Sequence, residues 1–76
     1  MNKLRRKALS DIAAQLEELK GALEEIQEEE EEYRDNMPEN LQTSERYEKA
    51  DDACNSLSDA VSSIEDALGS IESATE

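Results

Sequence analysis

Carboxylates are the residues of this chain with the most chemical potential, and they are concentrated in its middle. Seven glutamates lie between Glu24 and Glu32, and Asp35 and Glu39 follow. Because Ca²⁺ takes about six to eight oxygen ligands, such a segment first suggests a metal site. Consecutive residues of a helix point around the whole cylinder, however, so these glutamates cannot converge on one ion. The sequence therefore predicts no metal site and no cofactor.

A recognition role suits the acidic segment better. Exposed carboxylates can bind a basic protein surface, or imitate the phosphates of nucleic acid and occupy the basic groove of a DNA-binding protein. The plain alternative is a solvated helix end that only keeps the protein soluble. The candidate partner-binding residues are Glu24, Glu25, Glu28, Glu29, Glu31, Glu32, Asp35 and Glu39.

The remaining reactive residues give weaker signals. The basic start, Lys3 to Lys7, has no aromatic residue among its cations, so it indicates neither nucleic-acid nor membrane binding. Cys54 has no histidine anywhere in the chain to activate it, and it falls on an apolar position, where a free cysteine behaves as a small hydrophobe. No serine has a base partner. The sequence therefore predicts a protein that is not an enzyme.

Length and charge narrow the class further. The 76 residues suffice for one small domain, and the formal charge is −13. Residues 1–23 carry five cations against three acids, a net of +2, whereas residues 24–39 carry nine acids against one arginine, a net of −8. Such a surface repels phosphate groups and anionic lipid over most of its extent. With no long apolar run and a single cysteine, we expect a cytosolic protein.

The acidic segment lies inside a long predicted helix. Apolar residues alternate steps of three and four, the spacing of an a/d seam, with one polar interruption at Glu30. The pattern predicts a helix over about residues 3–35. The seam consists of Leu9, Ile12, Leu16, Leu19, Leu23, Ile26, Glu30, Tyr33 and Met37.

A turn over residues 36–43 should end this helix. Asn36 tolerates the left-handed conformation at a helix end, and the residue before Pro38 is pushed out of the helical region. Thr43 or Ser44 can then cap a second helix over about residues 44–75. Its seam repeats the pattern with Tyr47, Ala50, Cys54, Leu57, Val61, Ile64, Leu68 and Ile71.

The two seams mirror each other about the predicted turn. If the chain folds back there, residues such as Leu16 and Ile64 face each other, Tyr33 faces Tyr47, and every facing pair has the same sum of residue numbers. The basic start should then lie beside the acidic C-terminus. The predicted fold class is all-α: an antiparallel two-helix coiled-coil hairpin that forms a single domain over residues 1–76.

A lone hairpin buries only one side of each helix and should be marginally stable. Alanines recur at a strict seven-residue interval beside the second seam, which lets another helix approach closely. We expect a homodimer in which two hairpins form a four-helix bundle; a groove for a helix of another protein is the alternative. The expected interface residues are Ala53, Ala60, Ala67, Ala74 and Ala22.

Four short segments spread over most of the chain carry a resemblance to known sequences: Arg5-Arg6, Glu28-Glu29-Glu30, Asp35-Asn36-Met37-Pro38-Glu39-Asn40-Leu41-Gln42 and Ser44-Glu45-Arg46-Tyr47-Glu48. With these segments the chain resembles small acidic hypothetical proteins encoded in prophages and mobile elements of Gram-positive gut bacteria. The resemblance implies expression in a bacterial cytoplasm during phage or element maintenance. It brings no known activity or functional residue.

Three functions fit these features. The first is a non-enzymatic acidic helical module for protein–protein interaction that binds a basic partner. The second is a purely structural, self-assembling component whose charges serve solubility. The third is a phage-encoded inhibitor that mimics DNA and blocks a host nucleic-acid-binding protein.

Overall fold

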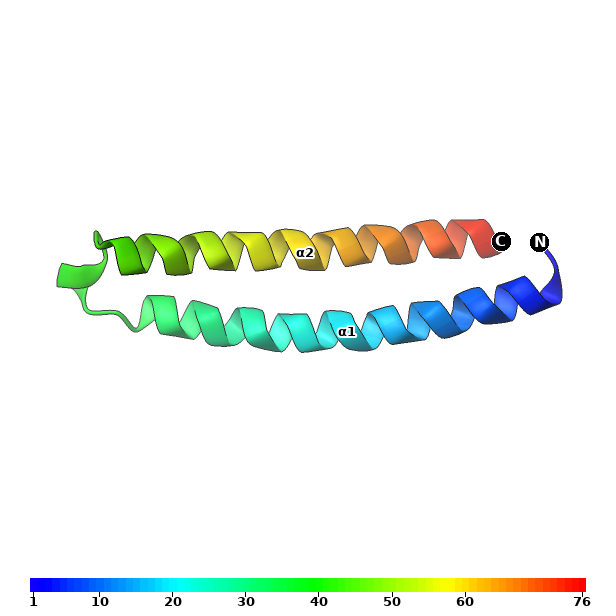
Figure 1. The fold of residues 1–76 in the computed structure, drawn as a ribbon, viewed down its shortest axis with the longest axis horizontal. Helices are drawn as coiled ribbons and strands as arrows, with labels where there is room; N and C mark the ends of the chain where they lie inside the picture. The colour runs from blue at the N-terminus through cyan, green and yellow to red at the C-terminus, as the bar shows by residue number, and fades with distance from the viewer.

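The computed structural model describes residues 1–76 and shows a helical hairpin (Figure 1). Helix α1 spans Lys3–Asp35, a short 3₁₀ turn η1 spans Glu39–Leu41, and helix α2 spans Glu45–Thr75. The two long helices lie side by side and antiparallel, and both termini lie at the same end (Figure 1). The molecule is a rod 59 Å long. The predicted helical hairpin is confirmed.

Local hydrogen bonds explain where the helices begin. The Asn2 side chain accepts a hydrogen bond from the backbone N–H of Arg5 at 2.8 Å, which satisfies one of the free donors at the start of α1. At the start of α2, the Ser44 hydroxyl accepts one from the N–H of Tyr47 at 3.2 Å. Of the two predicted caps, Ser44 is therefore the one used.

The turn closes without a left-handed residue. Asn36 caps α1 with φ at −86°, and no residue of the chain has positive φ, so the expected left-handed end is not formed. The backbone N–H of Asn36 still donates to Glu32 at 2.9 Å. Pro38, whose ring fixes φ, lies extended just before η1. Met37 folds inward and is buried, which closes this end of the core.

The core is a thin line between the helices. Only Met37, Ala50, Cys54 and Val61 are buried among 76 residues, and no large side chain is completely enclosed. The predicted seam of α2 does face α1, because all its members are buried or half-buried. A single hairpin therefore holds little apolar surface away from water.

Helix α1 is turned relative to the predicted seam. The seam of α1 has two stripes, one with Leu9, Leu16 and Leu23 and a second with Ile12, Leu19, Ile26 and Tyr33. The second stripe is largely open to solvent: Ile12 is 47% exposed, Leu19 59%, Ile26 51% and Tyr33 49%. The half-buried positions next to Leu9, Leu16 and Leu23 are instead Ala13, Lys20, Gln27 and Arg34. The expectation that both seam stripes of α1 are core is wrong for the second stripe.

Two ion pairs between the helices accompany this rotation. Lys20 lies 3.6 Å from Glu65, and Arg34 lies 2.9 Å from Asp51. These are the only ion pairs between the helices, and both join the same flank of α1 to the same flank of α2. The long cationic stems lie over the core while their charged ends reach α2, so this flank of α1 is the one that faces α2.

The same two pairs define the register. Their residue numbers add up to the same total, so one mirror register runs along the hairpin. Arg34 lies four residues beyond Glu30, and Asp51 lies one residue beyond Ala50. In the predicted mirror register Glu30 faces Ala50, and residues at these two offsets lie beside each other along the edge of an antiparallel helix pair. Lys20 and Glu65 stand in the same relation to Leu16 and Ile64.

The basic start lies beside the acidic C-terminus, as expected, since Arg6 and Glu72 border one hollow. No ion pair, however, joins the basic start or Lys49 to the opposite helix. Lys7 pairs with Asp11 of its own helix at 3.5 Å rather than with the acidic C-terminus, and Lys49 pairs with Glu45 of its own helix at 3.3 Å. Both pairs span one helical turn, a spacing at which opposite charges meet on any helix surface. The direction of the hairpin is therefore set by the seam and the two interhelix pairs.

The two glycines provide a test of helix continuity. A Cβ atom added at Gly21 or Gly69 would meet no heavy atom within 4 Å. Because glycine costs up to about 1 kcal/mol relative to alanine inside a helix, Gly21→Ala and Gly69→Ala should each raise the free energy of unfolding by up to that amount. Urea unfolding followed by circular dichroism measures the change. Ala14→Gly, at an exposed site of α1, should lower it comparably; a loss of stability in either alanine variant would contradict unbroken helices.

Candidate functional site

The acidic segment presents most of its carboxylates to solvent. Of the eight predicted partner-binding residues, only Glu31 is half-buried, and its carboxylate accepts a hydrogen bond from Gln27 at 3.2 Å. Asp35 is the only carboxylate of residues 24–39 in an ion pair, which it makes with Arg34 at 2.9 Å. We call the seven exposed members the acidic face: Glu24, Glu25, Glu28, Glu29, Glu32, Asp35 and Glu39.

The acidic face has the chemistry of a recognition surface. Nowhere in the structure do three cysteine, aspartate or glutamate side chains come together in a way that could hold a metal ion. Exposed, mostly unpaired carboxylates instead produce a negative field that extends about 10 Å at moderate salt and attracts cations over that distance. This arrangement can bind lysine and arginine side chains of another molecule.

A second flank carries the two interhelix ion pairs. Partial burial disfavours the charged form of Lys20, but Glu17, Glu65 and Glu24 outweigh it and raise the lysine's pKa. Arg34 is shared between Asp35 and Asp51. Both cations are therefore committed to contacts within the hairpin and are not available to a ligand.

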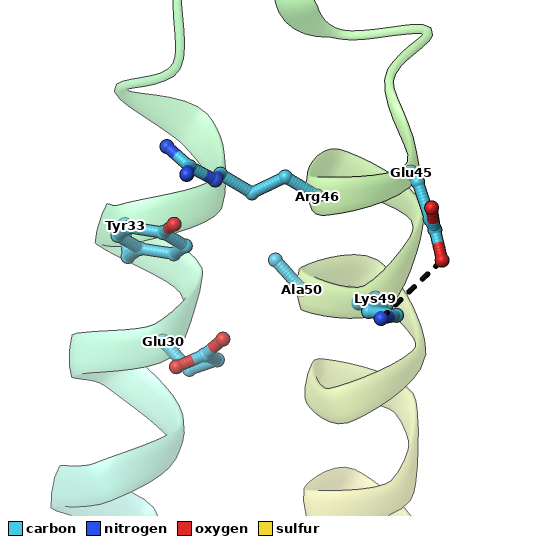
Figure 2. A pocket seen from close by; sticks show the side chains of 6 residues that line it. All are labelled: Glu30, Tyr33, Glu45, Arg46, Lys49 and Ala50. Carbon is cyan, nitrogen blue, oxygen red and sulfur yellow. Dashed lines mark ion pairs between the residues drawn. The ribbon is translucent and has the colours of Figure 1, made fainter.

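A shallow hollow lies beside the turn (Figure 2). Arg46 reaches from α2 toward Tyr33 on α1, Ala50 points into the space between the helices, and Glu30 lies one turn below Tyr33 (Figure 2). Tyr33 therefore lies toward Arg46, and 49% of it is exposed. The hollow is lined by charged side chains of both signs, with Tyr33 and Ala50 between them.

A third surface is apolar, and sequence reasoning identified only half of it. Tyr33 and Arg46 share the hollow, so seven-residue steps from each along its helix follow one side of the hairpin. Along α2 these steps reach the predicted alanines, of which Ala53 and Ala60 are half-exposed, and Ala67 and Ala74 exposed. Along α1 they reach residues that the sequence assigned to the core. We call this surface the open flank: Ile12, Leu19, Ile26 and Tyr33 with Ala53, Ala60, Ala67 and Ala74.

The only cysteine of the chain is buried between the helices. Cys54 is 3% exposed, and this burial raises the pKa of its thiol; Arg34 opposes the rise, and Glu31, Glu30 and Asp51 add to it. The thiolate, which is the nucleophilic form, is therefore disfavoured. The position does not offer a reactive sulfur.

Comparison with protein-family models, curated proteins and solved structures finds no match for the chain. Neither helix contains a stretch that is both long and apolar enough to cross a membrane. The case for a function therefore depends on the surfaces of the hairpin itself.

Burial of Cys54 predicts slow thiol labelling. In the folded protein, Cys54 should react with iodoacetamide far more slowly than a free thiol, and denaturant should restore the ordinary rate. Because its pKa is higher in the folded chain than in the unfolded chain, the thiol's contribution to stability is complete below the unfolded pKa. That contribution is lost as the pH rises through the folded value.

The matched control places the thiol on the surface of α2, one helical turn after Cys54. Ser58 is exposed, so Ser58→Cys in a Cys54→Ala background should be labelled quickly in the folded state. Mass spectrometry of the alkylated chain at successive times measures both rates. Equal rates for Cys54 and the control would show that the interface between the helices is open.

Proposed function

We propose that this protein is a non-enzymatic acidic helical interaction module that binds a basic surface of another protein through its acidic face. The observation that carries the proposal is the exposure of seven carboxylates within residues 24–39, of which only Asp35 has a cationic partner. A hairpin that needed these charges only for internal pairing would place cations opposite them.

The shape of the hairpin supports this role. Helix α1 is unbroken from Lys3 to Asp35, so six members of the acidic face lie on one helix, and the turn adds Glu39 beyond its end. A rigid surface of one charge sign recruits partners of opposite charge quickly and penalises partners of like charge. Such a module selects for basic proteins and against nucleic acid and anionic lipid.

Neutralising part of the acidic face tests the proposal. The variant Glu25→Gln/Glu28→Gln/Glu32→Gln should bind a basic partner about tenfold more weakly, given the modest contribution of each exposed charge. The protein, immobilised, is used to capture partners from bacterial lysate at low and at high ionic strength. Each captured protein is then purified and titrated against the wild type and the variant.

The matched control removes the same charge from another place. Asp52, Asp59 and Asp66 recur at seven-residue spacing and are exposed on α2. The variant Asp52→Asn/Asp59→Asn/Asp66→Asn should keep the wild-type affinity, and high salt should weaken binding of every partner. Equal losses of affinity in the two triple variants would show that only the net charge of the protein matters, and not the acidic face. If no basic protein is captured at low salt, the proposal is refuted.

A further inference from the structure

The open flank is built to receive a second copy of the same chain, and we infer that two hairpins pack there with opposite orientations, the turn of one against the termini of the other. Such a contact is isologous, because each copy contributes the same surface. The two copies make contact through the open flank and not through the acidic face. A failure of this inference is therefore distinguishable from a failure of the proposed function.

The exposed apolar stripe on α1 is symmetric about Leu19. Leu19 has Ile12 seven residues before it and Ile26 seven residues after it, and Arg5 and Tyr33 lie another seven residues out. When α1 meets α1 of a second copy antiparallel, Leu19 faces its equivalent and Ile12 faces Ile26. At the ends, Arg5 meets the Tyr33 ring, which is a favourable pairing of a cation with an aromatic face.

The alanine stripe on α2 is centred on Ala60, which lies at the same height along the hairpin as Leu19 of α1. Tyr33 and Arg46 border one hollow, and two heptads along each helix lead to Leu19 and Ala60. About Ala60 the alanines are again symmetric, with Ala53 on one side and Ala67 on the other. One two-fold axis can therefore pass through both stripes, so that large side chains meet on α1 while the alanines let the two α2 helices approach closely.

The charges along α1 select the orientation. Residues 1–23 carry a net +2 from five cations and three acids, and residues 24–39 carry a net −8 from nine acids and one cation. Opposed hairpins place the first segment of one copy beside the second segment of the other, so opposite charges meet. With both turns at one end, residues 24–39 would instead face residues 41–56, which hold four acids against two cations, and the contact would be repulsive.

The area is adequate for a stable pair. From Arg5 to Tyr33 the flank is about 42 Å long at 1.5 Å per residue, and two helices are about 20 Å wide, or about 800 Å² per copy. This matches the roughly 800 Å² that each partner buries in a standard protein interface. Pairing would also cover three large side chains that the lone hairpin leaves about half in water: Ile12, Leu19 and Ile26.

Disulfide trapping tests the arrangement. In a Cys54→Ala background, Leu19→Cys lies on the proposed axis and should form an intermolecular disulfide almost completely under mild oxidation. Ile12→Cys should not cross-link with itself, because its equivalent lies about 21 Å away along the helix, but it should cross-link with Ile26→Cys when the two are mixed. Non-reducing gels and intact mass measure the yields.

The alternatives give different patterns. If both turns lay at one end, α1 would face α2 of the other copy, and Leu19→Cys would cross-link with Ala60→Cys rather than with itself. That result, or the absence of any cross-link above that of the Ser62→Cys control on the opposite flank, would overturn the inference.

A charge placed on the axis provides a second measurement. Leu19 is 59% exposed within one chain, so Leu19→Glu has little reason to disturb the hairpin itself. In sedimentation equilibrium, the Leu19→Glu variant should have the mass of one chain, folded or, because it has lost its second copy, unfolded. The Ser62→Glu variant should have the mass of two chains. A dimer that survives Leu19→Glu would contradict the proposed contact.

Discussion

A pair of helices can bury only one side of each, and this geometric limit governs the whole molecule. Four of 76 residues are buried here, and none of them is a large aliphatic residue such as leucine or isoleucine. The contact between α1 and α2 therefore uses the whole predicted seam of α2 but only one of the two stripes of the α1 seam. What remains, the open flank, is the direct result of this shortage of facing surface, and so is its availability to another chain.

Much of the fold follows from periodicity and turn chemistry. Steps of three and four residues predict long helices, Pro38 breaks them, and mirrored seams predict that the chain folds back on itself. These signals are local or symmetric, so they can be recognised in one sequence. The hairpin is confirmed, as is Ser44 at the start of α2.

The rotation of α1 could not be predicted in the same way. Ile12 and Ala13 lie on either side of the same leucine stripe, and apolar character alone favours Ile12 for the core. The structure instead turns Lys20 and Arg34 inward, where they pair with Glu65 and Asp51 of α2 and their stems cover apolar atoms. A search for oppositely charged residues in the predicted register would have revealed this choice. The acidic face was recognisable from composition, since consecutive glutamates must point away from any single neighbour.

If association through the open flank completes the core, stability must depend on protein concentration. The direct measurement is the thermal unfolding midpoint, followed by circular dichroism over a hundredfold range of concentration. We predict a midpoint that rises steadily with concentration, since folding is then coupled to pairing. A midpoint that stays constant, together with the mass of a single chain at every concentration, would show that one hairpin is sufficient by itself and would contradict the account.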